Sequence, residues 1–233
     1  YSKNQIEFSV FVENNKKLEL ETNSIFRKIF NLFFIPILNN LPRNFKHKIK
    51  KTNKAAAEVI NNATNHNALE VLYSKGDMFS SDKILKKIFQ YVWFNLNNSK
   101  AVRNRLKIVR DELHKHLESI ARHDREINII SIASGSSRAK IETVNQSRYL
   151  DNTKLSITFL DKNPDAIEYS KKLAETINHE SIKLEWINDS VGNYLRSNPN
   201  KKYDVVEIVG LLDYFNDEKV IETFKGIHNL LQE

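Results

Sequence analysis

From about residue 127 onward, apolar runs alternate with segments whose apolar residues recur at helical spacing. The apolar runs predict four strands, at residues 128–133, 155–160, 182–187 and 204–209. Helices are expected between and after them, at residues 137–144, 164–177 and 217–231. Asn163 is expected to cap the second of these helices, which opens on Pro164, and Asp217 to cap the third. This alternation predicts an α/β fold, a Rossmann-like doubly wound parallel sheet with helices on both faces.

Upstream of residue 127 the pattern is mainly helical. Alternating apolar and polar residues on either side of a turn at residues 14–16 predict a small β-hairpin, with its second strand at residues 17–21. Helices are then expected at residues 54–73 and 81–97. A longer and more regular helix opens at Ser99, a suitable N-cap residue.

These patterns divide the chain into two regions. Residues 1–98 form a mainly helical N-terminal region, expected to serve as a lid, a substrate site or a docking surface. Residues 99–233 form the Rossmann-like domain. Because four strands are only part of a doubly wound sheet, this domain is expected to be incomplete at its C-terminus.

One N-terminal helix carries a stripe of large apolar side chains. Between Ser24 and Leu41, Phe and other apolar residues recur every three or four positions, with a break near Pro36 and with Arg27 and Lys28 beside them. Such a stripe either packs inside the protein or lies on a membrane surface. We expect packing, and peripheral membrane contact is the alternative.

Charge is unevenly distributed over the 233 residues, whose net charge is +7. Residues 1–126 carry 23 Lys and Arg against 13 Asp and Glu, whereas residues 127–233 carry 13 against 16. A basic front half can contact phosphates, anionic lipid headgroups or an acidic substrate. It is equally compatible with an ordinary solvated surface.

The chain contains no cysteine. Disulfides, zinc–thiolate sites and a cysteine nucleophile are therefore excluded, and the composition suits a cytoplasmic location. No apolar run reaches the roughly 18–20 residues of a membrane span. His114, His116 and His123 lie on or near the helix that opens at Ser99, and we expect surface or packing histidines and no metal site.

The candidate chemistry begins at the turn after the first strand, Ala133-Ser134-Gly135-Ser136-Ser137. Small residues there let a ligand approach the backbone closely. The second strand ends on Asp161, at the edge of the sheet where open α/β folds bind ligands, and its carboxylate can accept hydrogen bonds from ribose hydroxyls. Capping of the next helix is the structural alternative for Asp161, but Asn163 is better placed for that.

The spacing within the turn argues against a dinucleotide. A dinucleotide fingerprint needs a third small residue where helix and strand pack closest, and Arg138 falls at that position. An alternative pattern, with a small residue at every second position, falls on Ala133, Gly135 and Ser137 and places no bulky side chain at a small-residue position.

On these residues the sequence resembles the class I S-adenosylmethionine-dependent methyltransferases. The run from Ser131 to Ser137 is similar to their first motif, and residues 203–206 with Gly210 resemble their fourth strand. The resemblance implies that Asp161 holds the ribose and that Asp189 lies near the adenine. The implied cofactor-binding set is Ala133, Ser134, Gly135, Ser136, Asp161, Lys162, Asn188, Asp189, Ser190 and Gly210. The chain departs from the pattern where Ser131 replaces an acidic residue and where Ala133 and Ser137 replace glycines.

A second resemblance concerns the acceptor. Residues 98–105 and the segment from Gly210 to Phe215 are similar to bacterial methyltransferases associated with fatty-acid methyl ester signals. That resemblance implies a small acceptor, lipid-like or a carboxylic acid. Asp213 and Tyr214 follow the fourth strand and are the candidates to face it, with helix-leading polar residues as the alternative. No catalytic residue is selected, because direct methyl displacement needs a base only where the acceptor must lose a proton.

Two other classes of function stay open. A nucleic-acid methyltransferase would use the basic front half for phosphate contacts. Methylation of cytosine C5 is excluded because it needs a Cys nucleophile, and the Asn/Asp-Pro-Pro-aromatic motif of base-amine methylation is absent after the fourth strand. A non-catalytic Rossmann-like binding protein is the third interpretation, favoured by the missing glycines.

Overall fold

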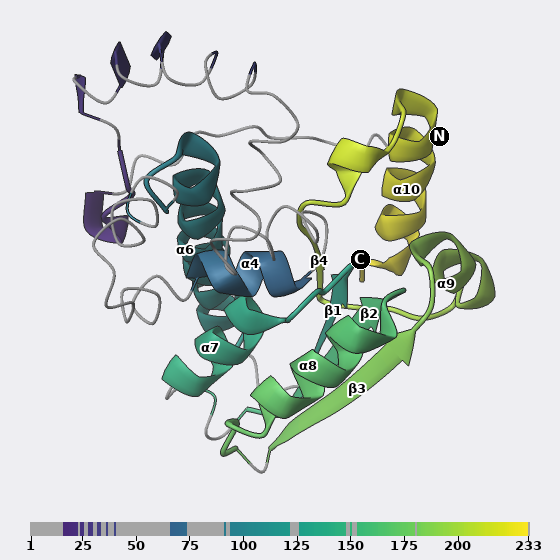
Figure 1. The fold of residues 1–233 in the computed structure, drawn as a ribbon. Helices are drawn as coiled ribbons and strands as arrows, with labels where there is room; N and C mark the ends of the chain where they lie inside the picture. Colours follow the sequence, from purple (N-terminus) through teal and green to yellow (C-terminus); the bar gives the residue numbers. More distant parts are fainter. Residues whose placement is uncertain are drawn as a thin grey trace. The chain divides into compact units, whose positions relative to one another are not determined.

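The computed structural model describes residues 16–22, 66–73, 94–121, 126–147, 153–179 and 181–232, with single positions at 24, 25, 28, 29, 32, 33, 36, 40, 91 and 150 (Figure 1). The chain divides into two compact units. The N-terminal unit comprises residues 15–108, and the sheet unit comprises residues 109–233 together with 1–14.

Four strands form the parallel sheet: β1 (Ile127–Ile132), β2 (Leu155–Asp161), β3 (Ile182–Asn188) and β4 (Val205–Ile208). Their order is β3-β2-β1-β4. The predicted α/β class and all four predicted strands are confirmed. Since all the strands run the same way, their carboxyl ends meet at one edge of the sheet.

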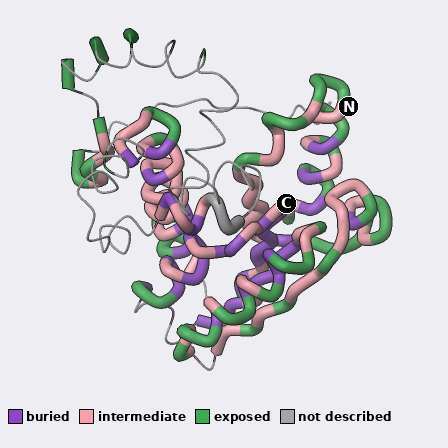
Figure 2. The backbone as a smooth tube through the Cα atoms, viewed as in Figure 1, coloured by how far each residue is buried: buried purple, intermediate pink, exposed green. Residues whose placement is uncertain are grey.

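Helices cover both faces of the sheet. One face packs against α7 (Arg138–Gln146), α8 (Pro164–Ala174) and the sheet-unit part of α6 (Asn97–Ile120). The other face packs against α9 (Val191–Ser197) and α10 (Asp217–Leu230). The inner strands β1 and β2 are almost wholly buried between these layers (Figure 2). Burial on both sides explains why their sequences are nearly continuous apolar runs.

The helix ends confirm one predicted cap and correct two others. The side chain of Asn163 accepts a hydrogen bond from the backbone N–H of Asp165, so it caps α8 as predicted. The cap of α10 is Asn216, which accepts from the N–H of Lys219, and Asp217 is the first helical residue. Helix α6 begins at Asn97, so Ser99 lies inside the first turn, where it is buried, and is not the N-cap.

The chain after α10 pairs beside the start of β4. The N–H of Tyr203 donates to the carbonyl of Leu230, and the N–H of Gln232 donates to the carbonyl of Tyr203. This parallel bridge between Tyr203 and Leu231 lies outside the four strands.

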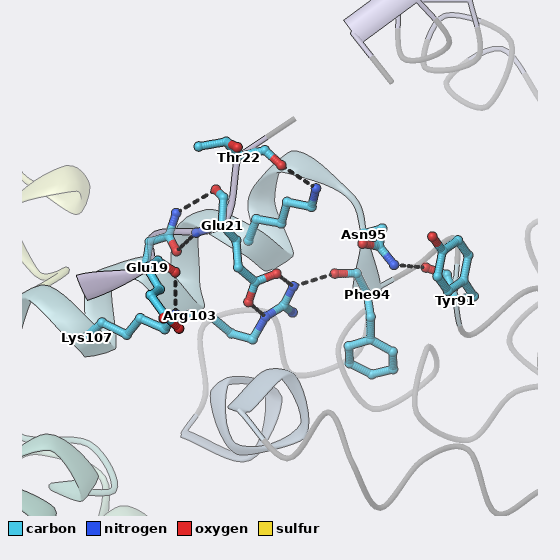
Figure 3. Close-up of polar contacts among 10 residues, drawn as sticks. Glu19, Glu21, Thr22, Tyr91, Phe94, Asn95, Arg103 and Lys107 are labelled. Carbon is cyan, nitrogen blue, oxygen red and sulfur yellow. Dashed lines mark hydrogen bonds and ion pairs between the residues drawn. The ribbon is translucent and has the colours of Figure 1, made fainter. Parts of the chain in front are cut away.

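In the N-terminal unit, residues 19–22 lie along one face of α6 (Figure 3). The guanidinium of Arg103 forms two hydrogen bonds with the carboxylate of Glu21, at 2.6 and 2.7 Å, and the amide of Asn104 bonds both the N–H and the carbonyl of Glu21. Lys100 and Lys107 donate to the carbonyls of Thr22 and Glu19. These four side chains come from one helical face, spaced 3, 1 and 3 residues apart, and together they fix the segment.

This contact replaces the second strand of the predicted hairpin. Residues 16–18 form a short 3-10 helix, η1 (Lys16–Leu18), and no strand is formed over residues 16–22, so that prediction is wrong. The first predicted hairpin strand lies outside the described residues. Of the predicted helix at 54–73, the described part is α4 (His66–Tyr73), and of the helix at 81–97 only Tyr91 and residues 94–97 are described.

The apolar stripe of the N-terminal unit is exposed where it is described. Of the stripe residues, Ile29 and Phe33 are 51% and 67% exposed, and their neighbours Ile25 and Leu32 are 75% and 71% exposed. The packing expected of the stripe is therefore not observed at Ile29 and Phe33. Its remaining phenylalanines lie outside the described residues.

Candidate cofactor site

The turn between β1 and α7 is built from left-handed backbone. Ala133, Gly135 and Ser137 have φ angles of 53°, 55° and 59°. A methyl group added at Gly135 would meet no atom within 4 Å, so the backbone conformation, and not lack of space, is what favours glycine there. The two residues between them, Ser134 and Ser136, are buried. The turn thus presents one open, side-chain-free position at the carboxyl edge of the sheet.

Asp161 joins this turn to the end of β2. One carboxylate oxygen accepts a hydrogen bond from the N–H of Gly135 at 2.8 Å, and the other accepts from the N–H of Asn163 at 2.9 Å. The carboxylate is therefore held in a fixed orientation by backbone donors. Each of its oxygens has a second lone pair and can accept a further hydrogen bond from a ligand.

The end of β3 extends the same edge. Asn188 lies beside Asp161 in the strand register, and its side-chain amide donates to the Asp161 carbonyl at 3.0 Å. Asp189 accepts from the N–H of Ser190 and from the side chain of Asn193. Ser190 is the N-cap of α9. Hydrogen bonds around Asp161 thus bring together three segments predicted to bind the cofactor: the turn after β1, the end of β2 and the end of β3.

The remaining candidates follow strands at the same edge without joining that network. Lys162 is exposed directly after β2. Gly210, with a φ of 73°, follows β4. Asp213 and Tyr214 are both exposed in η4 (Leu212–Tyr214), a single 3-10 turn that the sequence pattern did not predict. The substrate-facing role of these two residues stays a prediction.

A buried hydroxyl relay supports the turn from behind. The indole N–H of Trp186 donates to the hydroxyl of Ser170 at 3.0 Å, and that hydroxyl donates to the hydroxyl of Ser137 at 2.9 Å. Ser137 and Ser170 are both fully buried. The relay connects β3, α8 and the last left-handed residue of the turn. Sequence reasoning missed it, although a polar residue such as Ser170 on the apolar face of α8 was a usable signal.

A second missed feature is a buried ion pair beside the turn. Ser131 of β1 and Glu207 of β4 are paired in the strand register, and the Ser131 hydroxyl donates to the Glu207 carboxylate. The ammonium of Lys140, in the first turn of α7, lies 3.2 Å from the same carboxylate. The side chains of Lys140 and Glu207 are 7% and 13% exposed.

Two kinds of feature were not found in the part of the chain that the structure describes: a metal-ligand cluster and a membrane-spanning helix. The described residues contain no cluster of three or more His, Asp or Glu side chains arranged to hold a metal ion. None of their helices combines the length and the apolar character needed to cross a bilayer.

The sequence matches no protein-family model and no curated protein. Among solved structures, the chain is similar to a SAM-dependent methyltransferase from Agrobacterium tumefaciens, with 14% identity and a TM-score of 0.42 over 55% of this chain and 41% of that one. A SAM-dependent methyltransferase from Geobacter sulfurreducens, in complex with S-adenosyl-L-homocysteine, has 15% identity and a TM-score of 0.38 over 54% of this chain and 44% of that one. Magnesium protoporphyrin IX methyltransferase from Synechocystis PCC 6803, with bound SAH, has 11% identity and a TM-score of 0.48 over 77% of this chain and 68% of that one. The chain thus spans less than half the length of the first two proteins.

Proposed function

We propose that this chain is an S-adenosylmethionine-dependent methyltransferase that acts on a small, lipid-like or carboxylic acid acceptor. The observation that carries the proposal is the Asp161 carboxylate, which backbone N–H groups of Gly135 and Asn163 hold at the carboxyl edge. A nucleoside whose ribose reached this edge would find a fixed acceptor beside an open turn.

The residues present suit such a cofactor. Gly135 leaves open space where a side chain would otherwise stand. The hydroxyl of Ser134 is buried with no hydrogen-bond partner among the described residues, which leaves a polar group for a ligand to satisfy. Asp189 and Asn188 supply further acceptors and donors at the end of β3. When bound, the cofactor would supply an electrophilic methyl group on a sulfonium.

The chemistry asked of the protein is positioning. Asp161 and the turn would fix the nucleoside, so that an acceptor at the β4 side of the edge is held in line with the methyl–sulfur bond. A carboxylate acceptor is already a nucleophile and would need no base. Asp213 or Tyr214 would orient the acceptor and, for a hydroxyl acceptor, take its proton. The proposal includes a cytoplasmic location, which rests on the cysteine-free composition alone.

Three of the six cations on α6 do not favour the nucleic-acid alternative. Lys100, Arg103 and Lys107 are all used within the N-terminal unit, where they hold residues 19–22. Cations engaged in this way contribute less to a phosphate-binding surface. The non-catalytic alternative is distinguished by cofactor binding, which it does not require.

The test is a calorimetric titration of the full chain with S-adenosylmethionine and, separately, with NAD. We expect binding of S-adenosylmethionine, and a loss of at least about tenfold in affinity in Asp161→Ala, because a charge-assisted hydrogen bond to the ribose is removed. Asp165→Ala is the matched control, since this exposed carboxylate lies four residues along the chain, in the first turn of α8. Failure to bind either ligand would overturn the enzyme proposal, and preference for NAD would overturn the choice of cofactor.

A further inference from the structure

The buried pair of Lys140 and Glu207 lies where the order of the sheet reverses. From β1 the chain adds β2 and then β3 on one side, and returns to place β4 on the other side of β1. Ser131 and Glu207 face each other across this β1–β4 junction, each one residue before the end of its strand. Ligands of open α/β sheets bind at such a reversal, outside the carboxyl ends of the strands.

The position of Lys140 is costly for the fold. It is the third residue of α7, where the positive end of the helix dipole disfavours a cation, and only 7% of its side chain is exposed. Among the described residues, Glu207 is the one carboxylate that its ammonium contacts. A buried ion pair rarely stabilises a protein more than apolar side chains of the same volume would. The fold alone therefore gives no reason for a Lys–Glu pair at this point.

The pair matches one part of the proposed cofactor. Its groups, an ammonium and a carboxylate 3.2 Å apart, form a small dipole at the sheet reversal. The amino-acid end of S-adenosylmethionine is the complementary dipole, because it carries an ammonium and a carboxylate on one carbon atom. On binding, the ligand's ammonium can pair with the protein's carboxylate, and the ligand's carboxylate can pair with the protein's ammonium. No buried charge is then left without a partner.

We propose that Lys140 and Glu207 recognise the amino-acid end of the cofactor, with Glu207 accepting from its ammonium and Lys140 donating to its carboxylate. Ser131 is then a positioning residue, since its hydroxyl donates to Glu207 and fixes the carboxylate. This inference rests on the proposed function but concerns different residues and a different part of the ligand from Asp161.

The experiment compares three ligands by calorimetry on the full chain: S-adenosylmethionine, its decarboxylated form, and 5′-methylthioadenosine, which lacks the whole amino-acid end. Wild type is expected to bind S-adenosylmethionine at least about tenfold more tightly than methylthioadenosine. Glu207→Gln should lose most of that preference while its affinity for methylthioadenosine stays unchanged. Lys140→Met should lose the preference for S-adenosylmethionine over the decarboxylated form. Glu142→Gln, also in an ion pair and also on α7, is the matched control and should behave as wild type.

The outcomes separate the two proposals. Wild type that binds neither S-adenosylmethionine nor methylthioadenosine overturns the proposed function, and this inference with it. Wild type that binds both with equal affinity overturns the inference alone, and this measurement needs no variant. The inference also fails if Glu207→Gln weakens both ligands to the same extent. Should Glu207→Gln fail to fold, the double variant Lys140→Met/Glu207→Leu removes both charges together and should fold, bind methylthioadenosine and show no preference.

Discussion

The backbone N–H of Gly135 donates to the carboxylate of Asp161 at 2.8 Å, and this bond joins the turn after β1 to the end of β2. Hydrogen bonds to an ionised acceptor are shorter and stronger than neutral ones. The left-handed turn and the acidic strand end, which are 26 residues apart, therefore form one structural unit. A change at either residue is expected to alter the geometry of the other.

Gly135→Ala should lower the free energy of unfolding by about 1 kcal/mol, because a residue with a Cβ atom disfavours a φ of 55°. No steric clash adds to this, since the space around the position is open. Gly192→Ala is the matched control. It lies inside α9, where alanine favours the helix, so it should be neutral or stabilise by about 0.5 kcal/mol. Urea denaturation of both variants checks the opposite signs, and equal effects would rule out conformational strain at Gly135.

Ser170→Ala should destabilise the sheet unit by about 1–3 kcal/mol, because it leaves the hydroxyl of Ser137 and the indole N–H of Trp186 without their shared partner. Ser119→Ala, on the exposed surface of α6, removes a serine that bonds only its own helix and should change the stability little. Thermal denaturation measures both. If the relay also fixes the turn, Ser170→Ala should weaken cofactor binding although Asp161 is unchanged. An unchanged affinity would show that the relay contributes to stability only.

The elements that sequence reasoning predicted well are those whose signal is local. Apolar runs located all four strands, with ends displaced by one residue at most. For β1 and β2 the apolar run reflects burial on both faces. Helix α9 was missed because its segment, opening Val191-Gly192-Asn193, has weak helix propensity. It is stabilised instead by the Ser190 cap and by burial of Tyr194, and burial depends on the tertiary fold.

The candidate site shows the same division. The turn and Asp161 were recognised from their residue types and their places at strand ends. The Lys140–Glu207 pair and the hydroxyl relay were not, because they depend on which side chains face one another across strands and helices. Nothing in the separate segments indicates that Ser131 pairs with Glu207 until the register of β1 and β4 is known.

Tyr194 should make the protein less stable at alkaline pH. Burial, reinforced by the hydrogen bond with the Tyr203 hydroxyl, raises the pKa of Tyr194 well above its ordinary value. The unfolded chain ionises this group at about pH 10 while the native protein does not, so stability that is present below that pH is lost as the pH rises above it. Between about pH 9 and 11, wild type should lose up to about 1.4 kcal/mol more than Tyr194→Phe.

Urea denaturation at the two pH values measures that difference. Tyr214→Phe is the control, because Tyr214 is 65% exposed, and it should follow wild type at both pH values. An equal alkaline loss in wild type and in Tyr194→Phe would contradict the assignment to Tyr194.

Glu21→Gln should release residues 19–22 from α6. The side chain of Arg103 is only 7% exposed and would lose its charged acceptor, at a cost of about 2 kcal/mol. The readout is hydrogen exchange at the Glu21 amide, whose N–H donates to Asn104 at 2.8 Å and should exchange about 30-fold faster when the segment opens more readily. Glu19→Gln is the matched control, since Glu19 is exposed and its hydrogen bonds with Lys107 and Lys16 use backbone atoms of Glu19 that the substitution keeps. Equal exchange in the two variants would show that the Asn104 contacts hold the segment without the ion pair.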